Sequence, residues 1–438
     1  MVRTDVPELD REFGMLCWLT DANGFKGVLK ERYEDFIVEE IVKEGYILSL
    51  ENPRLLFSGY EGLFTHFILI KKGKGNFEAI WELSKILRVP VGFFFYSGNK
   101  DRDAITVQRV AVWNVPPEKL LNVKLPDGLK ICSPIRELRR VFVGEHKGNH
   151  FKIRIRDVDN LDYAEKISQE ILSNYLPNFF GYQRFGIMRP ISHIVGKLLL
   201  LRKYKEAVIT FLAAPSLTDN EFIAEVKDRI LQEDFESAYK MIPKRTFVFE
   251  AEMLRVLRRN KDYKKALKRL PSFMLRMLIE AYQALIFNKL LSLLLIDEYP
   301  LISSDGKITK LPILGTNIRI KDQKVRNTLM LILSEENISL SMLSNKEFPP
   351  LTFKGTMRKS LVKPILDKLI KENDSLIISF SLEKGSYATT ILRELLKENI
   401  IDALMSKLRR ERPYLFQKNL KRLNEFKKNI LKEFLDGG

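Results

Sequence analysis

The chain has 438 residues, of which 45% are apolar and 29% charged, so it is long enough for about two or three domain cores and is typical of a soluble globular protein. Its 73 lysine and arginine residues outnumber 56 acidic residues, and the net charge of +17 favours a polyanionic partner, nucleic acid ahead of an anionic membrane. Only Cys17 and Cys132 occur, which excludes a disulfide framework.

The first part of the chain, residues 25–157, carries patterns typical of β-strands with one intervening helix at residues 77–87. Its apolar runs are short, rich in aromatic and β-branched residues, and bounded by turn residues. Strands and helices do not alternate regularly, so a parallel nucleotide-binding fold is not expected. The expected strands are Phe36–Val42, Thr65–Lys71, Gly92–Tyr96 and Ile105–Trp113.

Asp101 stands in a basic turn between two of these strands, within the segment Gly98–Gln108 (GNKDRDAITVQ). Lys100 and Arg102 flank it, and neighbouring cations favour the ionised form of a carboxylate. An ionised carboxylate fixed at the end of a sheet can act as a nucleophile. The same residues also suit a solvated turn after a glycine, and spacing alone favours that simpler interpretation.

The segment Asn178–Gly186 (NFFGYQRFG) combines aromatic rings, an amide and an arginine. These groups suit a flipped nucleobase, because a ring can stack on the base, an amide can read its edge and an arginine can hold phosphate. An aromatic core turn with two glycines is the alternative, and the segment taken alone favours it slightly.

After Pro190 the composition changes to long helical patterns, which indicates a separate, mostly helical module. The most hydrophobic segment, Met274–Ile296, contains Arg276 and Glu280, and charged side chains are costly within a lipid bilayer. We therefore expect a core helix there and no membrane span. The expected helices are Leu198–Leu212, Phe222–Met241, Ala251–Lys268 and Met274–Leu295.

Strand-like residues return at Leu376–Leu382 and are followed by a helical pattern to about residue 404. This return to β-structure indicates that the C-terminal part completes the first domain, with the helical module inserted between its two halves.

Basic residues are concentrated in two stretches. Residues 254–269 hold eight lysines and arginines against one aspartate, and residues 406–438 hold ten against four acids. Each stretch is either a contact for a nucleic-acid backbone or a solvated helix face. The second is also amphipathic and can pack on the body of the protein through Leu420, Leu423, Phe426, Ile430 and Leu431.

We expect neither a metal nor a cofactor. The four histidines do not cluster at ligand spacing, since a glycine–asparagine turn separates His146 from His150. The G-x-G at Gly73–Gly75 lacks the third glycine of a dinucleotide loop. The N-terminal residues have no apolar stretch typical of an export signal, so a cytoplasmic location is expected.

Four segments resemble, in order, the motifs of the TruD-type tRNA pseudouridine synthases, in an archaeal-like form. Residues 30–40 (KERYEDFIVEE) are similar to K-x-x-x-E-D-F-x-V-x-E, and Gly98–Gln108 is similar to G-x-K-D-x-x-A-x-T-x-Q. Asn178–Gly186 is similar to N-(Y/F)-F-G-x-Q-R-F-G, and residues 385–395 (GSYATTILREL) to G-S-(F/Y)-A-T-x-x-L-R-E-L. The resemblance spans about residues 25–404, and its second and third motifs are highly specific.

The resemblance implies an α+β pseudouridine-synthase core, a mixed and largely antiparallel sheet flanked by helices, with a mainly helical, family-specific TRUD domain inserted. We place the core at residues 1–187 and 356–404, the inserted domain at 188–355, and a basic amphipathic tail at 405–438.

The resemblance also implies an isomerase that converts uridine to pseudouridine in tRNA, with position 13 as the expected target, tRNA as partner and no cofactor. Asp101 falls on the family's catalytic nucleophile, and Lys30 on a basic position that can pair with it. Thr106 and Gln108 are expected to orient the active loop, together with Lys100 as a support or an RNA contact. Four residues fall on positions that surround the target nucleotide: Phe36, Asn178, Phe180 and Tyr387.

Several alternatives stay open at this point. Asp101 can attack C1′ or remove a proton from C2′ to give a glycal. Arg184 can contact phosphate or brace the loop that holds Asn178. The same chemistry at another tRNA or RNA uridine, and a non-catalytic RNA-binding protein on this scaffold, are the alternative functions; a methyltransferase is disfavoured by the missing glycine loop.

Overall fold

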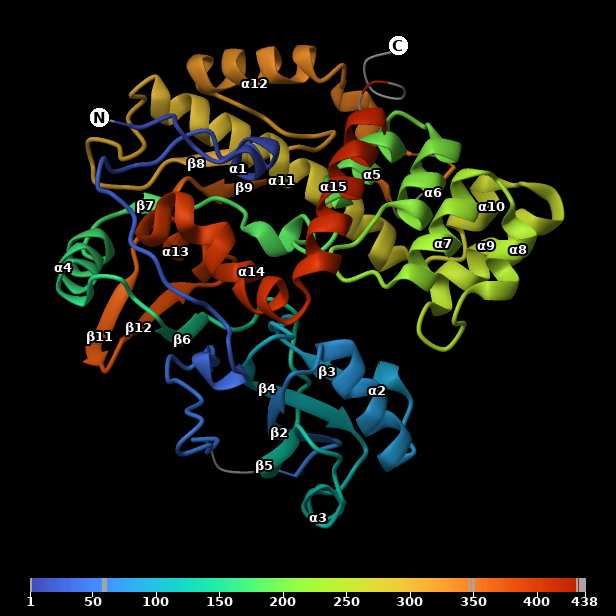
Figure 1. The fold of residues 1–438 in the computed structure, drawn as a ribbon. Helices are drawn as coiled ribbons and strands as arrows, with labels where there is room; N and C mark the ends of the chain where they lie inside the picture. Colours follow the sequence, from blue (N-terminus) through green and yellow to red (C-terminus); the bar gives the residue numbers. More distant parts are fainter. Residues whose placement is uncertain (1, 57–60, 346, 349–350, 431, 433–438) are drawn as a thin grey trace. The chain divides into compact units, whose positions relative to one another are not determined.

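The computed structural model describes residues 2–56, 61–345, 347–348, 351–430 and 432, and these form two compact units (Figure 1). We call residues 22–176 and 362–407 the sheet unit, and residues 1–21, 177–361 and 408–438 the helical unit. The chain passes from one unit to the other four times. Two of these boundaries fall within short strands, β7 (Leu176–Pro177) and β10 (Leu361–Val362), and the others follow residues 21 and 407.

The sheet unit is built on one eight-stranded sheet in the order β11-β12-β6-β1-β4-β2-β5, with β3 paired to β4. Only β1 and β4 run parallel, with Ile37 beside Ile105; the other described neighbours are antiparallel. The mixed, largely antiparallel sheet expected from the sequence is therefore confirmed. The strands are β1 (Phe36–Ile41), β2 (Phe64–Lys72), β3 (Phe94–Tyr96), β4 (Ile105–Trp113), β5 (Leu129–Glu137), β6 (Gly148–Ile155), β11 (Ile365–Glu372) and β12 (Ser375–Glu383).

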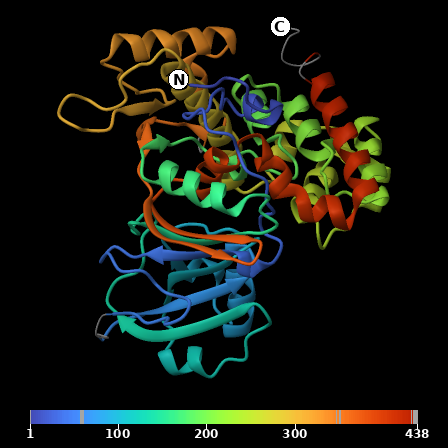
Figure 2. The same ribbon diagram turned by 60° about the vertical axis from the view of Figure 1, so that its left-hand side comes forward.

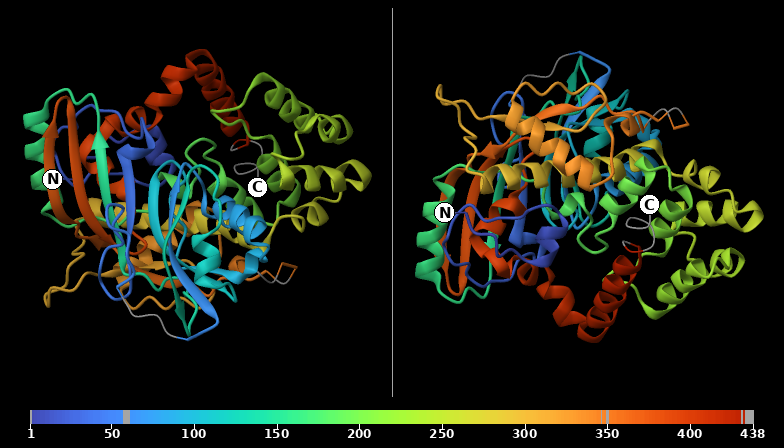
Figure 3. Two further views of the ribbon diagram at one scale, coloured as in Figure 1. Left: turned by 90° about the horizontal axis from the view of Figure 1, so that it is seen from below. Right: turned by 90° about the horizontal axis from the view of Figure 1, so that it is seen from above.

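Strands from both ends of the chain complete this sheet. β12 pairs with β6 from Leu376 beside Ile155 to Glu383 beside Gly148. Helix α4 (Leu161–Leu172) contacts both β11 and β12, and Figure 2 shows it lying along the orange hairpin that they form. The left view of Figure 3 shows the same hairpin as the next two strands after β6.

Helices flank the sheet. The apolar face of α2 (Asn76–Leu87) packs into a core with Phe67 of β2 and Val110 of β4, and all three contribute fully buried side chains. The remaining helices that begin in this unit are α3 (Pro117–Leu121), α13 (Ala388–Leu396) and α14 (Ile400–Glu411).

The helical unit replaces three of the expected long helices by pairs of shorter ones. The breaks fall at Arg202, Glu233 and Lys261, whose φ angles of 58°, 55° and 52° lie in the left-handed region that ends a helix. Helical spacing continues through each break, so the pattern alone predicts one helix where there are two. The pairs are α5 (Ser192–Leu200) and α6 (Tyr204–Ala213), α7 (Glu221–Leu231) and α8 (Phe235–Met241), and α9 (Val248–Asn260) and α10 (Tyr263–Leu267).

These helices form a closed group, because each from α5 to α10 contacts the next and α10 returns to contact α6 (Figure 1, green to yellow). The long helix α11 (Ser272–Ile296) packs on α5. It is long and apolar enough to cross a membrane, but 78% of its most apolar stretch is buried within the protein, as expected for a core helix. The unit also contains α1 (Glu8–Glu12), α12 (Gln323–Glu335), α15 (Pro413–Ile430) and the hairpin β8 (Lys310–Ile313) with β9 (Thr356–Lys359).

The described residues near both ends of the chain, 2–21 and 408–430, belong to the helical unit, which differs from the division expected from the sequence. Tyr182 donates a 2.6 Å hydrogen bond to Asp10, so residues 1–21 pack beside the segment after Pro177. On α15, the amide of Asn419 donates to the carbonyl of Asp219 at 2.8 Å. Of the apolar side chains expected to pack, Leu423, Phe426 and Ile430 are buried and Leu420 is half-buried, whereas Leu431 lies outside the described residues.

Candidate active site

The turn that carries Asp101 meets the start of β1. Since β1 and β4 are parallel neighbours, their first residues lie at the same edge of the sheet, and Ile105 lies beside Ile37. Phe36 opens β1, and Asp101 lies just before β4. The topology of the sheet therefore brings a residue from the first motif next to the turn of the second.

Lys30 joins these two residues. Its ammonium lies 3.4 Å from Oδ2 of Asp101 and 4.1 Å from the centre of the Phe36 ring, a cation–π distance. The Lys30 backbone has a φ of 57°, in the left-handed region. This conformation changes the direction of the chain at the first residue of the motif. The Asp101 side chain keeps 31% exposure, so a substrate atom can approach the carboxylate.

Lys71, at the end of β2, fixes the main chain of the turn by hydrogen bonds. Its ammonium is fully buried and donates to the carbonyls of Asp101 at 2.7 Å, Lys74 at 2.8 Å and Lys100 at 3.3 Å. Burial lowers the pKa of Lys71 to about 8, partly offset by the charge of Asp101. Two of these three hydrogen bonds fix the backbone at the candidate nucleophile and at the residue before it.

A second buried cluster anchors the turn through Glu40. Its Oε2 accepts from Ser97 at 2.7 Å and lies 3.1 Å from the ammonium of Lys100, which also donates to Asn149 at 2.5 Å. The amide oxygen of Asn76 accepts from the Lys100 backbone N–H at 3.2 Å. The Lys100 side chain is only 2% exposed, so of its two expected roles this geometry fits support of the turn.

Asp35 fixes the start of β1. It accepts two hydrogen bonds from the Arg156 guanidinium, at 2.9 and 2.7 Å, and a third from the backbone N–H of Arg32 at 2.8 Å. Such a bidentate pair holds both partners in one geometry. The carboxylates of the first motif thus position Phe36 and the turn.

Thr106 and Gln108 lie on β4, where Thr106 is beside Lys71 and Gln108 beside Leu69 of β2. Both are buried, and within the described residues the Thr106 hydroxyl and the Gln108 amide have no hydrogen-bond partner. Any orienting effect on the loop therefore acts through packing in this structure.

Tyr387 stands at the N-cap of α13, after the end of β12, and is half-buried. Its carbonyl accepts from the Thr390 hydroxyl at 2.8 Å, which fixes the first turn of the helix. Just before it, the Lys384 backbone N–H donates to the carbonyl of Lys147 at 2.9 Å. Lys147 belongs to the segment that leads into β6.

Asn178 and Phe180 belong to the helical unit, where Arg358 of β9 holds them. The Arg358 guanidinium donates to the Asn178 carbonyl at 3.0 Å and to its side-chain oxygen at 2.7 Å, and lies 4.1 Å from the centre of the Phe180 ring. The Phe180 ring also meets Phe287 edge-on at 5.4 Å. Phe180 is 7% exposed, so the ring is largely enclosed in this structure.

Arg184 lies in the short 3₁₀ turn Tyr182–Arg184 and pairs with Glu280 of α11 at 3.3 Å. Its guanidinium is 5.6 Å from the Phe180 ring. Of its two expected roles, this geometry fits bracing of the loop.

The sequence alone did not single out Lys71, Glu40 and Arg358. Lys71 lies in an ordinary strand pattern, and its partners are backbone carbonyls, which cannot be recognised from the sequence because every residue has one. Glu40 is the last residue of the first motif, and that is the signal that would have found it. Among the described residues, no three His, Cys, Asp or Glu side chains are placed to hold a metal ion.

The fold is α+β, with an accessible carboxylate paired with Lys30 at one edge of a mixed sheet. The family model described as tRNA pseudouridine synthase D (TruD) matches residues 12–306 and 298–395. The chain belongs to the TruD family of tRNA pseudouridine synthases, which are isomerases that convert uridine to pseudouridine in tRNA.

Relatives support the assignment over most of the chain. It is 33% identical to the "Probable tRNA pseudouridine synthase D" of Methanococcus aeolicus, over 87% of this chain and 98% of that protein. It is 30% identical to a protein of the same name from Pyrobaculum islandicum, over 90% and 97%. A crystal structure of the TruD protein of Methanosarcina mazei is similar with a TM-score of 0.68 and 26% identity, covering 91% of this chain and 99% of that one.

Proposed function

We propose that Asp101 is the nucleophile with which this chain isomerises a uridine of tRNA, at position 13, in the cytoplasm and without a cofactor. The observation that carries the proposal is the Lys30–Asp101 pair at 3.4 Å, with the Phe36 ring 4.1 Å from the same ammonium. A cation beside an accessible carboxylate attracts it and holds its oxygen in one place.

The reaction breaks the N1–C1′ bond, turns the uracil while it stays bound, and forms a C5–C1′ bond. The proton on C5 is lost and N1 gains one, so no electrons leave the substrate. The Asp101 carboxylate begins this by attack on C1′ or by removal of the C2′ proton, and both routes remain open. In either case the main chain of Asp101, fixed by Lys71, keeps the carboxylate oxygen in reach of the sugar.

We further propose that Phe36, Tyr387, Asn178 and Phe180 surround the target nucleotide. An aromatic enclosure would keep the detached uracil from water until it rejoins. Phe180 and Asn178 are held by Arg358, so access to the ring and the amide depends on that guanidinium. We assign the catalytic core to the sheet unit and the family-specific part to the helical unit.

The test incubates the purified protein, without added cofactor, with an unmodified tRNA pool and maps pseudouridine by carbodiimide-dependent primer extension. Asp101→Asn should abolish the new stop and leave tRNA affinity near that of the wild type. Asp103→Asn is the matched control, because Asp103 lies exposed in the same turn and should retain activity.

A stop at position 13 that depends on Asp101 would establish reaction and target together. A stop elsewhere would correct the target and keep the nucleophile. Tight tRNA binding without any stop, in both the wild type and Asp103→Asn, would instead favour a non-catalytic RNA-binding protein.

A further inference from the structure

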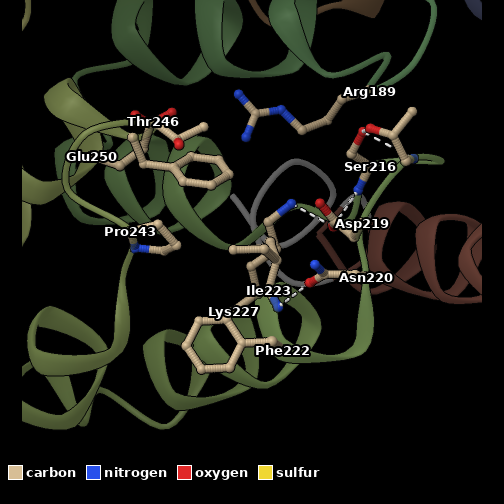
Figure 4. Close-up of a pocket in the computed structure, with 12 residues that line it drawn as sticks. Arg189, Ser216, Asp219, Asn220, Phe222, Ile223, Lys227, Pro243, Thr246 and Glu250 are labelled. Atoms are coloured by element: carbon tan, nitrogen blue, oxygen red, sulfur yellow. Dashed lines mark hydrogen bonds and ion pairs between the residues drawn. The ribbon is translucent and has the colours of Figure 1, made fainter.

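A pocket of about 440 Å³ lies within the helical unit, among α7, α9 and the loop before α7 (Figure 4). Its volume falls in the range of about 300–1,000 Å³ that is usual for small-ligand sites. None of the candidate active-site residues lines it. The residues that line it and that the argument uses are Arg189, Asp219, Phe222, Lys227, Phe247 and Glu250.

Two charged groups of this pocket keep hydrogen-bonding capacity unused. Arg189 donates to the carbonyl of Phe211 at 3.2 Å, and its guanidinium has five N–H groups in all. Within the described part of the chain, the Glu250 carboxylate has no hydrogen bond or ion pair, although it shares the pocket with Arg189. The charge of Glu250 interacts with the charges of Arg189 and Lys227. The pocket therefore offers a planar donor group and a carboxylate whose hydrogen-bond acceptor sites are unused.

A buried ion pair gives the pocket a fixed wall. The Lys227 ammonium lies 2.6 Å from Oδ2 of Asp219, and the two side chains are 7% and 8% exposed. The same Asp219 oxygen accepts from the backbone N–H of Ser216 at 2.8 Å. Figure 4 shows this pair beside Ile223, with Arg189 on one side of the space and Phe222 on the other.

The remaining walls are apolar and suit a flat ring. Phe222 is 46% exposed, and Phe247 and Pro243 also line the space. Exposed aromatic rings of this kind stack unpaired bases in RNA-binding proteins. Arg245 lies two residues after Pro243 and is exposed, so a cation is close in sequence to this wall.

Guanine is the base whose edges match this set. An arginine pairs with its O6 and N7 acceptors, and a carboxylate accepts from its N1–H and N2–H₂ donors. Adenine would present an acceptor at N1 to Glu250, and uracil and cytosine lack the second ring that would fill the space between the aromatic walls.

We propose that this pocket binds a guanine base, taken unstacked from the tRNA substrate at a place other than the target uridine. The inference rests on tRNA being the substrate, but it needs no assignment of the nucleophile. The helical unit would then read a second nucleotide and fix the register of the RNA.

The test measures equilibrium binding with the full chain, so it does not depend on turnover. Calorimetry compares GMP, AMP, CMP and UMP on the wild type, Glu250→Gln and Arg189→Met. Glu225→Gln and Arg229→Met are matched controls, since this exposed pair lies on α7 outside the pocket. A second arm measures the Kd for tRNA of the same proteins at one salt concentration.

We expect GMP to bind the wild type at least about tenfold more tightly than the other nucleotides, and each pocket variant to bind GMP at least about tenfold more weakly, the effect of one good base contact. The tRNA Kd should rise in both pocket variants and stay unchanged in both controls. Equal binding of all four nucleotides, or GMP affinity unaffected by Glu250→Gln, would overturn the proposal. Selective GMP binding with an unchanged tRNA Kd would keep the guanine site and overturn RNA as its source.

Discussion

The buried ammonium of Lys71 donates a 2.7 Å hydrogen bond to the backbone carbonyl of Asp101. It therefore fixes the main chain of the candidate nucleophile and leaves the carboxylate to Lys30 and the substrate. The two lysines therefore have different roles: Lys71 positions the Asp101 backbone, and Lys30 places a positive charge beside its carboxylate.

Replacing Lys71 by methionine should lower kcat about a hundredfold, since a displacement of the catalytic group by about 1 Å costs roughly that much. The tRNA Kd should stay near the wild-type value, because Lys71 is buried. Single-turnover kinetics measure the effect, with Lys72→Met, an exposed neighbour, as control. A Lys71→Met enzyme with wild-type kcat would show that the turn holds its geometry without the ammonium.

The same lysine gives opposite pH dependences of activity and stability. Its pKa is about 8 in the folded protein and near 10.5 when unfolded, so the unfolded chain binds more protons between these values and stability should rise with pH through that window. Above pH 8 the neutral amine has two N–H groups for three carbonyls, so kcat should fall. Urea unfolding and kcat measured from pH 7 to 10 test both, and Lys71→Arg, which stays charged, should lack the alkaline loss of kcat.

Arg358 should be needed for the conformation of Asn178 and Phe180. Arg358→Met removes hydrogen bonds of 3.0 and 2.7 Å to Asn178 and the cation over the Phe180 ring. We expect a stability loss of about 1–3 kcal/mol in urea unfolding, together with a lower kcat/KM. Lys354→Met, at an exposed position nearby in sequence, is the control. Unchanged kcat/KM with reduced stability would limit Arg358 to a structural role.

The basic C-terminal segment is best tested by charge removal. Deleting residues 406–438 would also remove the buried face of α15, so weaker tRNA binding by that truncation could reflect unfolding. Neutralising Arg412, Lys421 and Lys428, all exposed, should weaken tRNA binding and reduce the slope of log Kd against log salt by about 0.7–0.9 for each phosphate that is no longer neutralised. An unchanged slope would show that these cations do not contact phosphate and that α15 has only a packing role.

His193 should make the helical unit sensitive to acid. Burial lowers its pKa from 6.5 to about 3, so between these values the unfolded chain binds more protons and stability falls as the pH falls. The ring packs edge-on against Phe13 and Phe185, which suits an aromatic replacement. Tm measured from pH 7 to 4 should fall less steeply in His193→Phe than in the wild type. Equal slopes would assign the acid sensitivity to other groups.

The local sequence pattern was sufficient to predict much of the sheet and the turn that carries Asp101. The expected strand Ile105–Trp113 coincides with β4, because its β-branched run is bounded by clear turn residues. The motif around Asp101 located the candidate nucleophile before any geometry was known. The long helices were misjudged at Arg202, Glu233 and Lys261, since a non-glycine residue in the left-handed region leaves no trace in apolar spacing.

The supports of the site could not be predicted, because they depend on contacts between distant segments. Arg358 and Asn178 are 180 positions apart, and Lys71 acts on carbonyls that every residue possesses. Thr106 and Gln108 on β4 were expected to orient the active loop. The structure shows that, among the described residues, the Thr106 hydroxyl and the Gln108 amide have no hydrogen-bond partner.

The pairing of β6 with β12 joins two strands that the ribosome makes far apart in time. The ribosome makes β6 and then the whole helical insert before Leu376 can join Ile155. At about 5–20 residues per second, the interval is roughly 10–40 s, during which the edge of β6 lacks its partner strand. If the insert folds while the chain is still on the ribosome, its two ends come closer together and β12 has a shorter distance to travel to β6. The insert would then promote the pairing of the two halves that it separates in sequence.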